Sequence, residues 1–244
     1  MLPLFRKIRK QYAHDNQFLK YLRYAIGEIV LVVIGILIAL QINNWNEKKK
    51  EADNERYILQ EVLANLREDS VLIKEIVIRR KLAQAASFHL LDYVGKEKMN
   101  PDTLKLDMAR FLSFERYFPI NNAYEVLKSK GLKLSNRELT TKLSRYYDFE
   151  QKKVTSSIYD IETNFNKIFS NREGLLPFIT EMELNTFVNI SDPNDPVFIE
   201  ELKNEVMSFK DNNGGTINSL LNFQKINDNL IKLVDNELQK LSDR

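Results

Sequence analysis

The sequence predicts an all-α protein in which a single N-terminal transmembrane helix continues into a long stalk helix, followed by an extracytoplasmic up-and-down helical bundle. Three observations support this fold class. The nineteen-residue run 24–42 contains only two strongly polar residues, Glu28 and Gln41, and at 1.5 Å per residue it crosses most of a ~30 Å hydrocarbon core. Only seven Gly and six Pro interrupt the 244 residues. Elsewhere, apolar residues recur at spacings of three and four, which is typical of one helix face.

The apolar run is predicted to be an uncleaved membrane anchor over residues 21–45. A cleaved signal peptide has a shorter apolar region of about 7–15 residues and small residues at its cleavage site. Here 23 mixed residues precede the run, and no small-x-small pair follows it. Six Lys and Arg before the span against four just after it favour a cytoplasmic N-terminus. We therefore expect a basic cytoplasmic segment (1–20), an inner-membrane span, and a periplasmic remainder.

The stalk helix is expected over residues 46–98. No Pro or Gly occurs between Asn46 and Val94. Five apolar residues follow the alternating spacing of a helical seam, with Asp69 interrupting it; they are Leu59, Val62, Leu66, Ile73 and Ile76. Gly95 and Pro101 should end the helix, because both residue types interrupt helical structure.

Residues 99–244 are predicted to form the helical bundle that packs on the stalk. Short helices are expected at about 102–116 and 122–129. The sequence from Ser135 to Glu138 is a capping-box pattern, in which Ser accepts from a free amide and Glu reaches back. It predicts the start of a second long helix that reaches about Asn171.

The sequence TFVNISDPNDP, residues 186–196, is predicted to be the principal surface loop, because Asn, Asp, Ser and Pro favour turns. Asp195 and Pro196 suit the start of a helix that reaches Lys210. The run 212–215, Asn-Asn-Gly-Gly, is expected to end that helix. A last helix is expected from about Thr216 to Leu241. Antiparallel packing of these helices is the simplest way to bury their apolar faces.

A small-residue seam is predicted on the membrane span. At 100° per residue, five residues lie within about 40° of one line on the helix; they are Glu28, Val32, Gly35, Ala39 and Ile42. Small residues four apart let two helix backbones approach closely. We interpret this span seam as a contact with a second copy or a membrane partner. Glu28 could instead reach the headgroup region without a specific role, or carry protons within a partner's helices.

An aromatic-rich stretch, residues 111–131, offers a second candidate contact. Most of its rings are expected in the core, but Phe114, Tyr117 and Phe118 are a possible partner surface if they are exposed.

No chemistry-bearing motif accompanies these features. The chain has no Cys, which excludes disulfides, thiol catalysis and thiolate metal sites. Its two His residues are far apart, and no nucleophile motif or phosphate-binding Gly-rich loop is found. The 36 Lys and Arg are balanced by 34 Asp and Glu, so a nucleic-acid surface is not expected. We predict no enzyme activity, no cofactor and no metal, and do not expect a small-molecule ligand.

Two blocks of sequence resemble an uncharacterised family of membrane-anchored proteins from Bacteroidota, a domain of unknown function. The first runs from Lys20 to Glu47 and reads KYLRYAIGEIVLVVIGILIALQINNWNE; the second is AYEVLKSKGLKLSNRELTTKLSRYY, residues 123–147. The resemblance implies an inner-membrane location in a diderm bacterium and an α-helical periplasmic part. It implies no activity, ligand or catalytic residue.

The sequence therefore favours a membrane-anchored structural or interaction protein that self-associates or binds a cell-envelope partner through its periplasmic helices. Two other functions stay open. One is an accessory subunit of a proton-coupled membrane complex that uses Glu28. The other is a periplasmic ligand sensor, which is weakened by the short segment before the span.

Overall fold

The computed structural model describes residues 18–94 and 101–242. The predicted basic segment lies almost wholly outside the described residues. The chain divides into two compact units between Asn54 and Glu55.

The first unit contains the N-terminal part of helix α2, which begins at Phe18 and ends at Val94. Its apolar run packs against nothing in the described chain: Ile29 is 63% exposed and Leu31 is 72% exposed. An 18-residue window of this helix has a mean hydropathy of 2.6, with none of it buried. By length and composition, α2 is the one described helix that is apolar enough to cross a membrane.

The second unit is built mainly from helices, which confirms the all-α class. After α2 come α3 (Pro101–Phe111), α4 (Asn122–Ser129) and α5 (Arg137–Arg145). A π-helical turn, η1 (Tyr146–Glu150), joins α5 to α6 (Gln151–Ser170). A short 3₁₀ turn, η2 (Leu176–Phe178), and two strands, β1 (Ile179–Glu183) and β2 (Phe187–Ile190), precede α7 (Pro196–Ser242).

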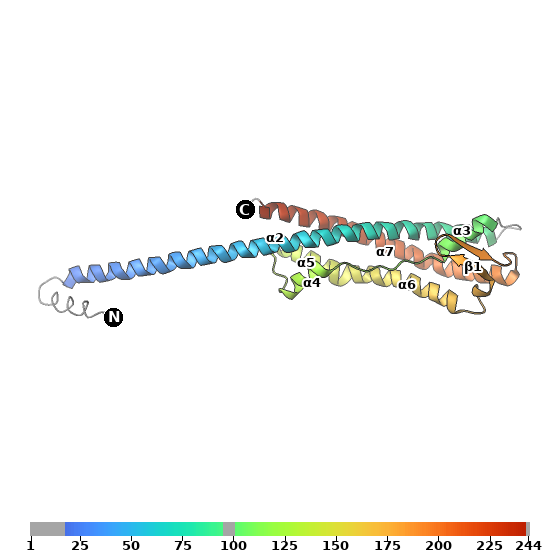
Figure 1. Cartoon of the computed structure of the whole chain (residues 1–244), viewed down its shortest axis with the longest axis horizontal. Coiled ribbons are helices and arrows are strands. Elements are labelled where there is room, and N and C mark those ends of the chain that lie inside the picture. Colours follow the sequence, from blue (N-terminus) through green and yellow to red (C-terminus); the bar gives the residue numbers. More distant parts are fainter. Residues whose placement is uncertain (1–17, 95–100, 243–244) are drawn as a thin grey trace. The chain divides into compact units, whose positions relative to one another are not determined.

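Within this second unit, the later part of α2 lies beside α6 and α7 (Figure 1). Helix α3 ends at Phe111, five residues earlier than the sequence suggested, and the chain then runs back along α2 in an extended form. Ser113 bonds to Arg80 and Ile120 bonds to Asp69, so this segment runs antiparallel to α2. As a result α6 follows the direction of α2, and α7 runs opposite to both.

Side-chain caps set the starts of α5 and α7. Asp195 accepts from the amide of Val197 at 2.7 Å and starts α7 at Pro196, as predicted. The cap of α5 is Asn136, whose Oδ1 accepts from Leu139 N at 3.1 Å. The prediction of Ser135 as the cap was wrong by one residue, because its hydroxyl and amide both donate to Glu55 of α2 at 2.9 Å.

The end of α4 requires glycine. Gly131 has φ +79°, which a residue without Cβ adopts at little cost. Its amide bonds to the carbonyl of Lys128, and the amide of Leu132 bonds to the carbonyl of Leu127. These two hydrogen bonds form a Schellman motif, which satisfies the last carbonyls of the helix.

The expected break at 212–215 is not present, because α7 continues through it to Ser242. Asn213 is fully buried and its amide donates to Arg80 O at 3.0 Å and to Gln84 Oε1 at 2.8 Å. Thr216 and Ile217, which follow the glycine pair, are also buried. Tertiary contacts on both sides therefore outweigh the low helix propensity of consecutive glycines.

Replacing these glycines should stabilise the bundle. A Cβ at Gly214 or Gly215 meets nothing within 4 Å, and alanine favours helix over glycine by about 1 kcal/mol. Gly214→Ala and Gly215→Ala should each raise the free energy of unfolding by about 0.5–1 kcal/mol, measured by chemical denaturation. Gly131→Ala serves as the opposite control, because its positive φ makes a side chain costly. A loss of stability in the α7 variants would contradict the prediction.

The predicted surface loop 186–196 is partly wrong, because its first half forms strand β2. Strands β1 and β2 pair antiparallel, with Met182 opposite Val188, and Asn185 turns between them with φ +65°. Val188 is fully buried where β2 packs against α3. This buried contact stabilises a hairpin that would be marginal alone.

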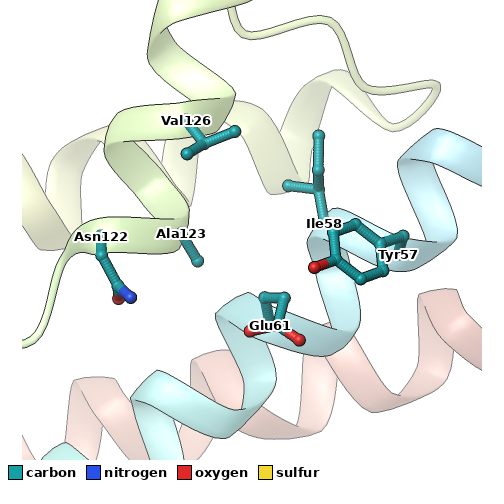
Figure 2. Close-up of a pocket in the computed structure, with 6 residues that line it drawn as sticks. All are labelled: Tyr57, Ile58, Glu61, Asn122, Ala123 and Val126. Carbon is teal, nitrogen blue, oxygen red and sulfur yellow. The ribbon is translucent and has the colours of Figure 1, made fainter.

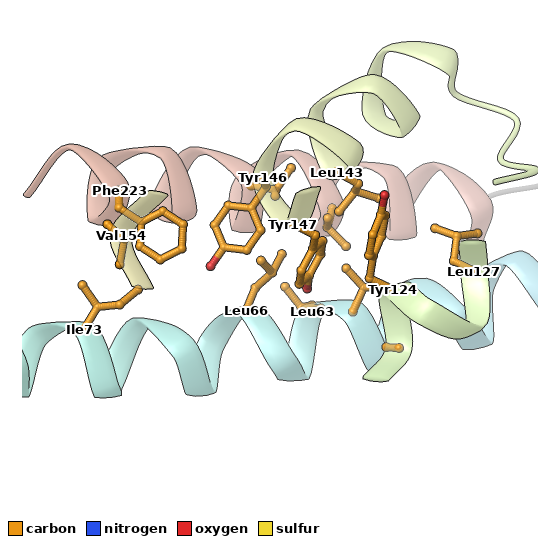
Figure 3. Close-up of a cluster of buried hydrophobic side chains, with 14 of the residues drawn as sticks. Leu63, Leu66, Ile73, Tyr124, Leu127, Leu143, Tyr146, Tyr147, Val154 and Phe223 are labelled. Atoms are coloured by element: carbon orange, nitrogen blue, oxygen red, sulfur yellow. The ribbon is translucent and has the colours of Figure 1, made fainter. Parts of the chain in front are cut away.

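The core of the second unit consists of two apolar clusters separated by polar side chains. The first cluster surrounds Leu66 and Tyr146, and the second surrounds Leu90 and Phe198. Between them lies a set that we call the polar layer: Arg80, Gln84, Ser113, Glu115, Asn213 and Thr216. Figure 3 shows part of the first cluster, with aromatic rings from α4, η1 and α7 packed over the leucines of α2.

Candidate functional site

Asp69 is a fully buried carboxylate in the middle of α2. Its Oδ2 accepts hydrogen bonds from Tyr146 Oη and Gln151 Nε2, both at 3.0 Å. The amide of Ile120 approaches Oδ1 at 3.4 Å, and Asn227 donates to the Tyr146 hydroxyl at 2.6 Å. Groups from η1, α6 and the extended segment therefore meet at this carboxylate of α2, and α7 is linked to it through Tyr146. Such hydrogen bonding offsets much of the cost of burial.

Tyr146, which donates to this carboxylate, belongs to a row of four aromatic rings. Figure 3 shows the rings. Tyr146 stacks on Phe223 with a centroid distance of 4.9 Å, and its edge meets Tyr147 at 4.8 Å. Tyr147 stacks in turn on Tyr124 at 4.5 Å. Burial, and then the charge of Asp69, raise the pKa of Tyr146 and Tyr147 far above the usual value. Both tyrosines thus remain neutral. Tyr146 acts as a hydrogen-bonding group, whereas the buried Tyr147 hydroxyl has no hydrogen-bond partner among the described residues and contributes by packing.

The stability of the bundle should depend on the protonation of Asp69. Burial raises the pKa of this carboxyl above 3.8, and the hydrogen bonds from Tyr146, Tyr117, Ile120 and Gln151 lower it only in part. The folded chain therefore takes up a proton at a higher pH than the unfolded chain, so this group adds stability as pH falls through its folded pKa toward 3.8.

Asp69→Asn should remove that contribution. The quantity to measure is the wild-type free energy of unfolding minus that of the variant, obtained by denaturation at each pH. This difference should increase as the pH is lowered from about 7 to about 4. Asp148 and Glu138, whose pKa values are lowered by lysine partners, act in the opposite sense. They are present in both proteins and cancel in the difference. A difference that does not change with pH would contradict the assignment.

The polar layer contains a buried ion pair. Arg80 Nε lies 2.7 Å from Glu115 Oε2, with the two side chains 1% and 8% exposed. Arg80 Nη2 also donates to Ser113 O at 2.7 Å and to its hydroxyl at 2.9 Å. Burial lowers the pKa of the Arg80 guanidinium, and Glu115 counteracts this. The pair connects the extended segment to α2 and has the geometry of a structural contact.

A shallow groove lies between α2 and α4, with a volume of about 200 Å³. Figure 2 shows Tyr57, Ile58 and Glu61 of α2 on one side. Asn122, Ala123 and Val126 of α4 form the other side. A groove this small and mixed in polarity suits part of a protein side chain better than a cofactor.

The five residues of the span seam lie in the exposed first part of α2. All five are exposed, and a Cβ at Gly35 would meet nothing within 4 Å. No contact within the described chain therefore explains why small residues occupy this line.

The predicted aromatic surface is not a single exposed patch. Phe118 is 74% exposed, whereas Tyr117 is buried. Phe114 is half-buried and packs against Phe165 at a centroid distance of 4.6 Å. Phe118 is therefore the ring of the three that remains fully available to a partner.

Arg80 and Glu115 were not predicted to be contact residues, and Asn213 was predicted only as part of a helix end. Arg80 follows Ile73 and Ile76 on the buried side of α2 at spacings of three and four. A charged residue at a position where the helical spacing predicts an apolar one was the signal that could have indicated a buried polar contact. Asp69 gave the same signal. Among residues 18–94 and 101–242, no group of three His, Cys, Asp or Glu side chains is placed to hold a metal ion.

Comparison with known proteins gives one match. Residues 28–131 are similar to a family described as "Family of unknown function (DUF6090)". This supports the resemblance to an uncharacterised family over less than half of the chain, and the description names neither a membrane nor an organism. No curated protein and no solved structure matches the chain. The matched stretch contains Asp69, Arg80 and Glu115.

Proposed function

We propose that the protein is a single-pass, inner-membrane-anchored interaction protein. Its N-terminus lies in the cytoplasm, and its helical bundle lies in the periplasm. There the bundle self-associates or binds a partner of the cell envelope. The protein performs no catalysis.

One observation supports the membrane anchor. The apolar run of α2 is exposed along its length, without a covering partner in the described chain. Leaving a Leu, Ile or Val side chain in water rather than burying it costs about 1.5–3 kcal/mol. A run of this length is stable only in lipid or against other helices. The excess of Lys and Arg before the span supports the cytoplasmic N-terminus.

The interaction role rests on what the second unit contains. Two of its buried charged groups are engaged in structural contacts: Asp69 with Tyr146, and Arg80 with Glu115. Several large apolar side chains remain exposed on this unit, including Ile78 of α2 at 60% and Phe118 of the extended segment at 74%. Where exposed apolar groups gather on one face, they mark a contact surface.

In-cell cross-linking followed by purification and mass spectrometry tests this function. Recovery of self cross-links or of one envelope protein supports it. A strictly monomeric protein that recovers no partner from native membranes contradicts it. For topology, single cysteines suit a chain that has none: Phe118→Cys should react with a membrane-impermeant maleimide once the outer membrane is opened. Protection of that cysteine until the inner membrane is broken would contradict the orientation.

Glu28→Gln separates the proposed role from a proton-coupled accessory role. Glu28 is exposed and is the one acidic residue in the run 24–42. A variant that keeps its cross-links but loses the cellular function would favour proton transfer. Loss of the cross-links would place the contact in the span seam.

A further inference from the structure

The outer face of α2 in the second unit carries a regular apolar line. Between Tyr57 and Ala85, every seventh residue is apolar and exposed; the five are Tyr57, Ala64, Val71, Ile78 and Ala85. Tyr57 is 63%, Val71 56% and Ile78 60% exposed. Residues seven apart lie only about 20° from one another around a helix. The line spans about 42 Å at 1.5 Å per residue. Single exposed apolar residues are ordinary, but a seven-residue repeat keeps them on one side of the helix, as one of the two apolar positions of a coiled-coil seam does.

Charged residues of opposite sign border this line. Four residues after the first three line residues come Glu61, Glu68 and Glu75, about 40° to one side. Three residues after Ala64, Val71 and Ile78 come Arg67, Lys74 and Lys81, about 60° to the other side. All six are exposed. Arg67 also pairs with Asp235 of α7 at 3.1 Å. The face therefore has an apolar centre, an acidic border and a basic border.

We propose that this outer face of α2 binds the same face of a second copy, in a parallel and in-register dimer. The proposal deepens the proposed function, because it rests on self-association and names the surface and the partner. Val71 and Ile78 meet their own counterparts at the centre. Lys74 of each copy faces Glu75 of the other.

Charge complementarity selects the second copy and its direction. A two-fold axis parallel to the two helices places the basic border of one copy opposite the acidic border of the other. An antiparallel pairing places basic opposite basic and acidic opposite acidic, which is unfavourable. Neither Lys74 nor Glu75 forms an ion pair within the described residues, so both are free to pair across the dimer.

Membrane anchoring favours the same direction. Tyr57 is the residue of the outer face that lies nearest in the sequence to the run 24–42. If both copies enter one bilayer through that run, the two outer faces are tethered to the same membrane from the Tyr57 end. Tethering in a common plane raises the effective concentration of each copy for the other. A modest helix contact can then suffice for association.

Single-cysteine cross-linking tests the face and its register. The purified full-length chain is placed in phospholipid vesicles as Val71→Cys, Ile78→Cys or the control Tyr159→Cys, and is oxidised mildly. Tyr159 is 64% exposed on α6 and lies outside the proposed face. The two α2 variants should form disulfide-linked dimers, and the control should not. Both α2 positions can cross-link only in a parallel pair: an antiparallel pair centred on one would separate the other by about 20 Å, beyond disulfide reach.

Charge reversal tests the ion pair independently. Lys74→Glu alone or Glu75→Lys alone should weaken self-association by roughly threefold to tenfold. The double variant K74E/E75K restores opposite charges across the dimer and should recover most of the affinity. Both residues are exposed, so helical content by circular dichroism should stay constant in all three variants. Failure of the double variant to recover would overturn the pairing.

The outcomes separate this inference from the proposed function. A wild-type protein that self-associates, with no more cross-linking at Val71 and Ile78 than at Tyr159, overturns the face but leaves the function standing. A wild-type protein that neither self-associates nor recovers a partner overturns both. Cross-linking of Ile78→Cys in cells to a different envelope protein, without self cross-links, overturns the second copy as occupant.

Discussion

Arg80→Ala is expected to destabilise the bundle by about 3–5 kcal/mol, because it leaves the Glu115 carboxylate buried without its cation. The Glu115 side chain is 8% exposed and depends on Arg80 for its closest charge contact at 2.7 Å. The variant also leaves Ser113 O without the Arg80 Nη2 donor. Chemical denaturation of the detergent-solubilised chain, followed by circular dichroism, measures the loss.

The matched control replaces both partners. Arg80→Met combined with Glu115→Met removes the two charges while retaining much of their volume. Replacing a buried ion pair by apolar residues is often close to neutral. The double variant should therefore be more stable than Arg80→Ala. If it is no more stable, the cost lies in packing around Arg80 rather than in the unpaired carboxylate.

Tyr146→Ala is expected to cost about 3–5 kcal/mol, the range for removing a fully buried aromatic side chain. Tyr146 is 0% exposed and packs between Phe223 and Tyr147. Its hydroxyl also joins Asp69 to Asn227. The loss should appear as a lower denaturation midpoint.

Tyr146→Phe separates the two contributions. It keeps the ring but removes the hydroxyl, which should cost about 1–3 kcal/mol because Asp69 and Asn227 each lose a partner. Tyr159→Ala is the surface control: Tyr159 is 64% exposed and its substitution should change stability by less than about 0.5 kcal/mol. Equal losses for Tyr146→Phe and Tyr146→Ala would contradict a role in packing.

Local sequence signals predicted the helices well where they reflect local physics. The Pro-free and Gly-free run before Gly95, the Asp195 cap and the helix at 122–129 needed no knowledge of the rest of the chain. The continuous α7 could not be predicted, because Asn213 is held by Arg80 and Gln84, far away in sequence. Strand β2 likewise depends on the burial of Val188 against α3.

The candidate sites were predicted only in part, for a related reason. Exposure decides whether an aromatic or apolar residue is available, and exposure is a property of the folded chain. Tyr117 and Phe118 are neighbours of similar character, yet one is buried and the other is 74% exposed. The seven-residue line on α2 is present in the sequence, but its availability depends on the other helices covering the opposite side.

The polar layer divides the bundle into two parts that need not open together. In this layer, Asn213 bonds to Arg80, and Thr216 bonds to Ser157. The Gly214–Gly215 pair lies between these two residues of α7 and lowers its local helix propensity. Contiguous apolar clusters tend to open as separate cooperative units. In hydrogen exchange, the backbone amides around Leu66 and Phe223 should therefore share one free energy of opening. Those around Leu90 and Phe198 should share a different one. A bundle built in this way can lose the hairpin end to local unfolding while the end that contains Asp69 stays folded.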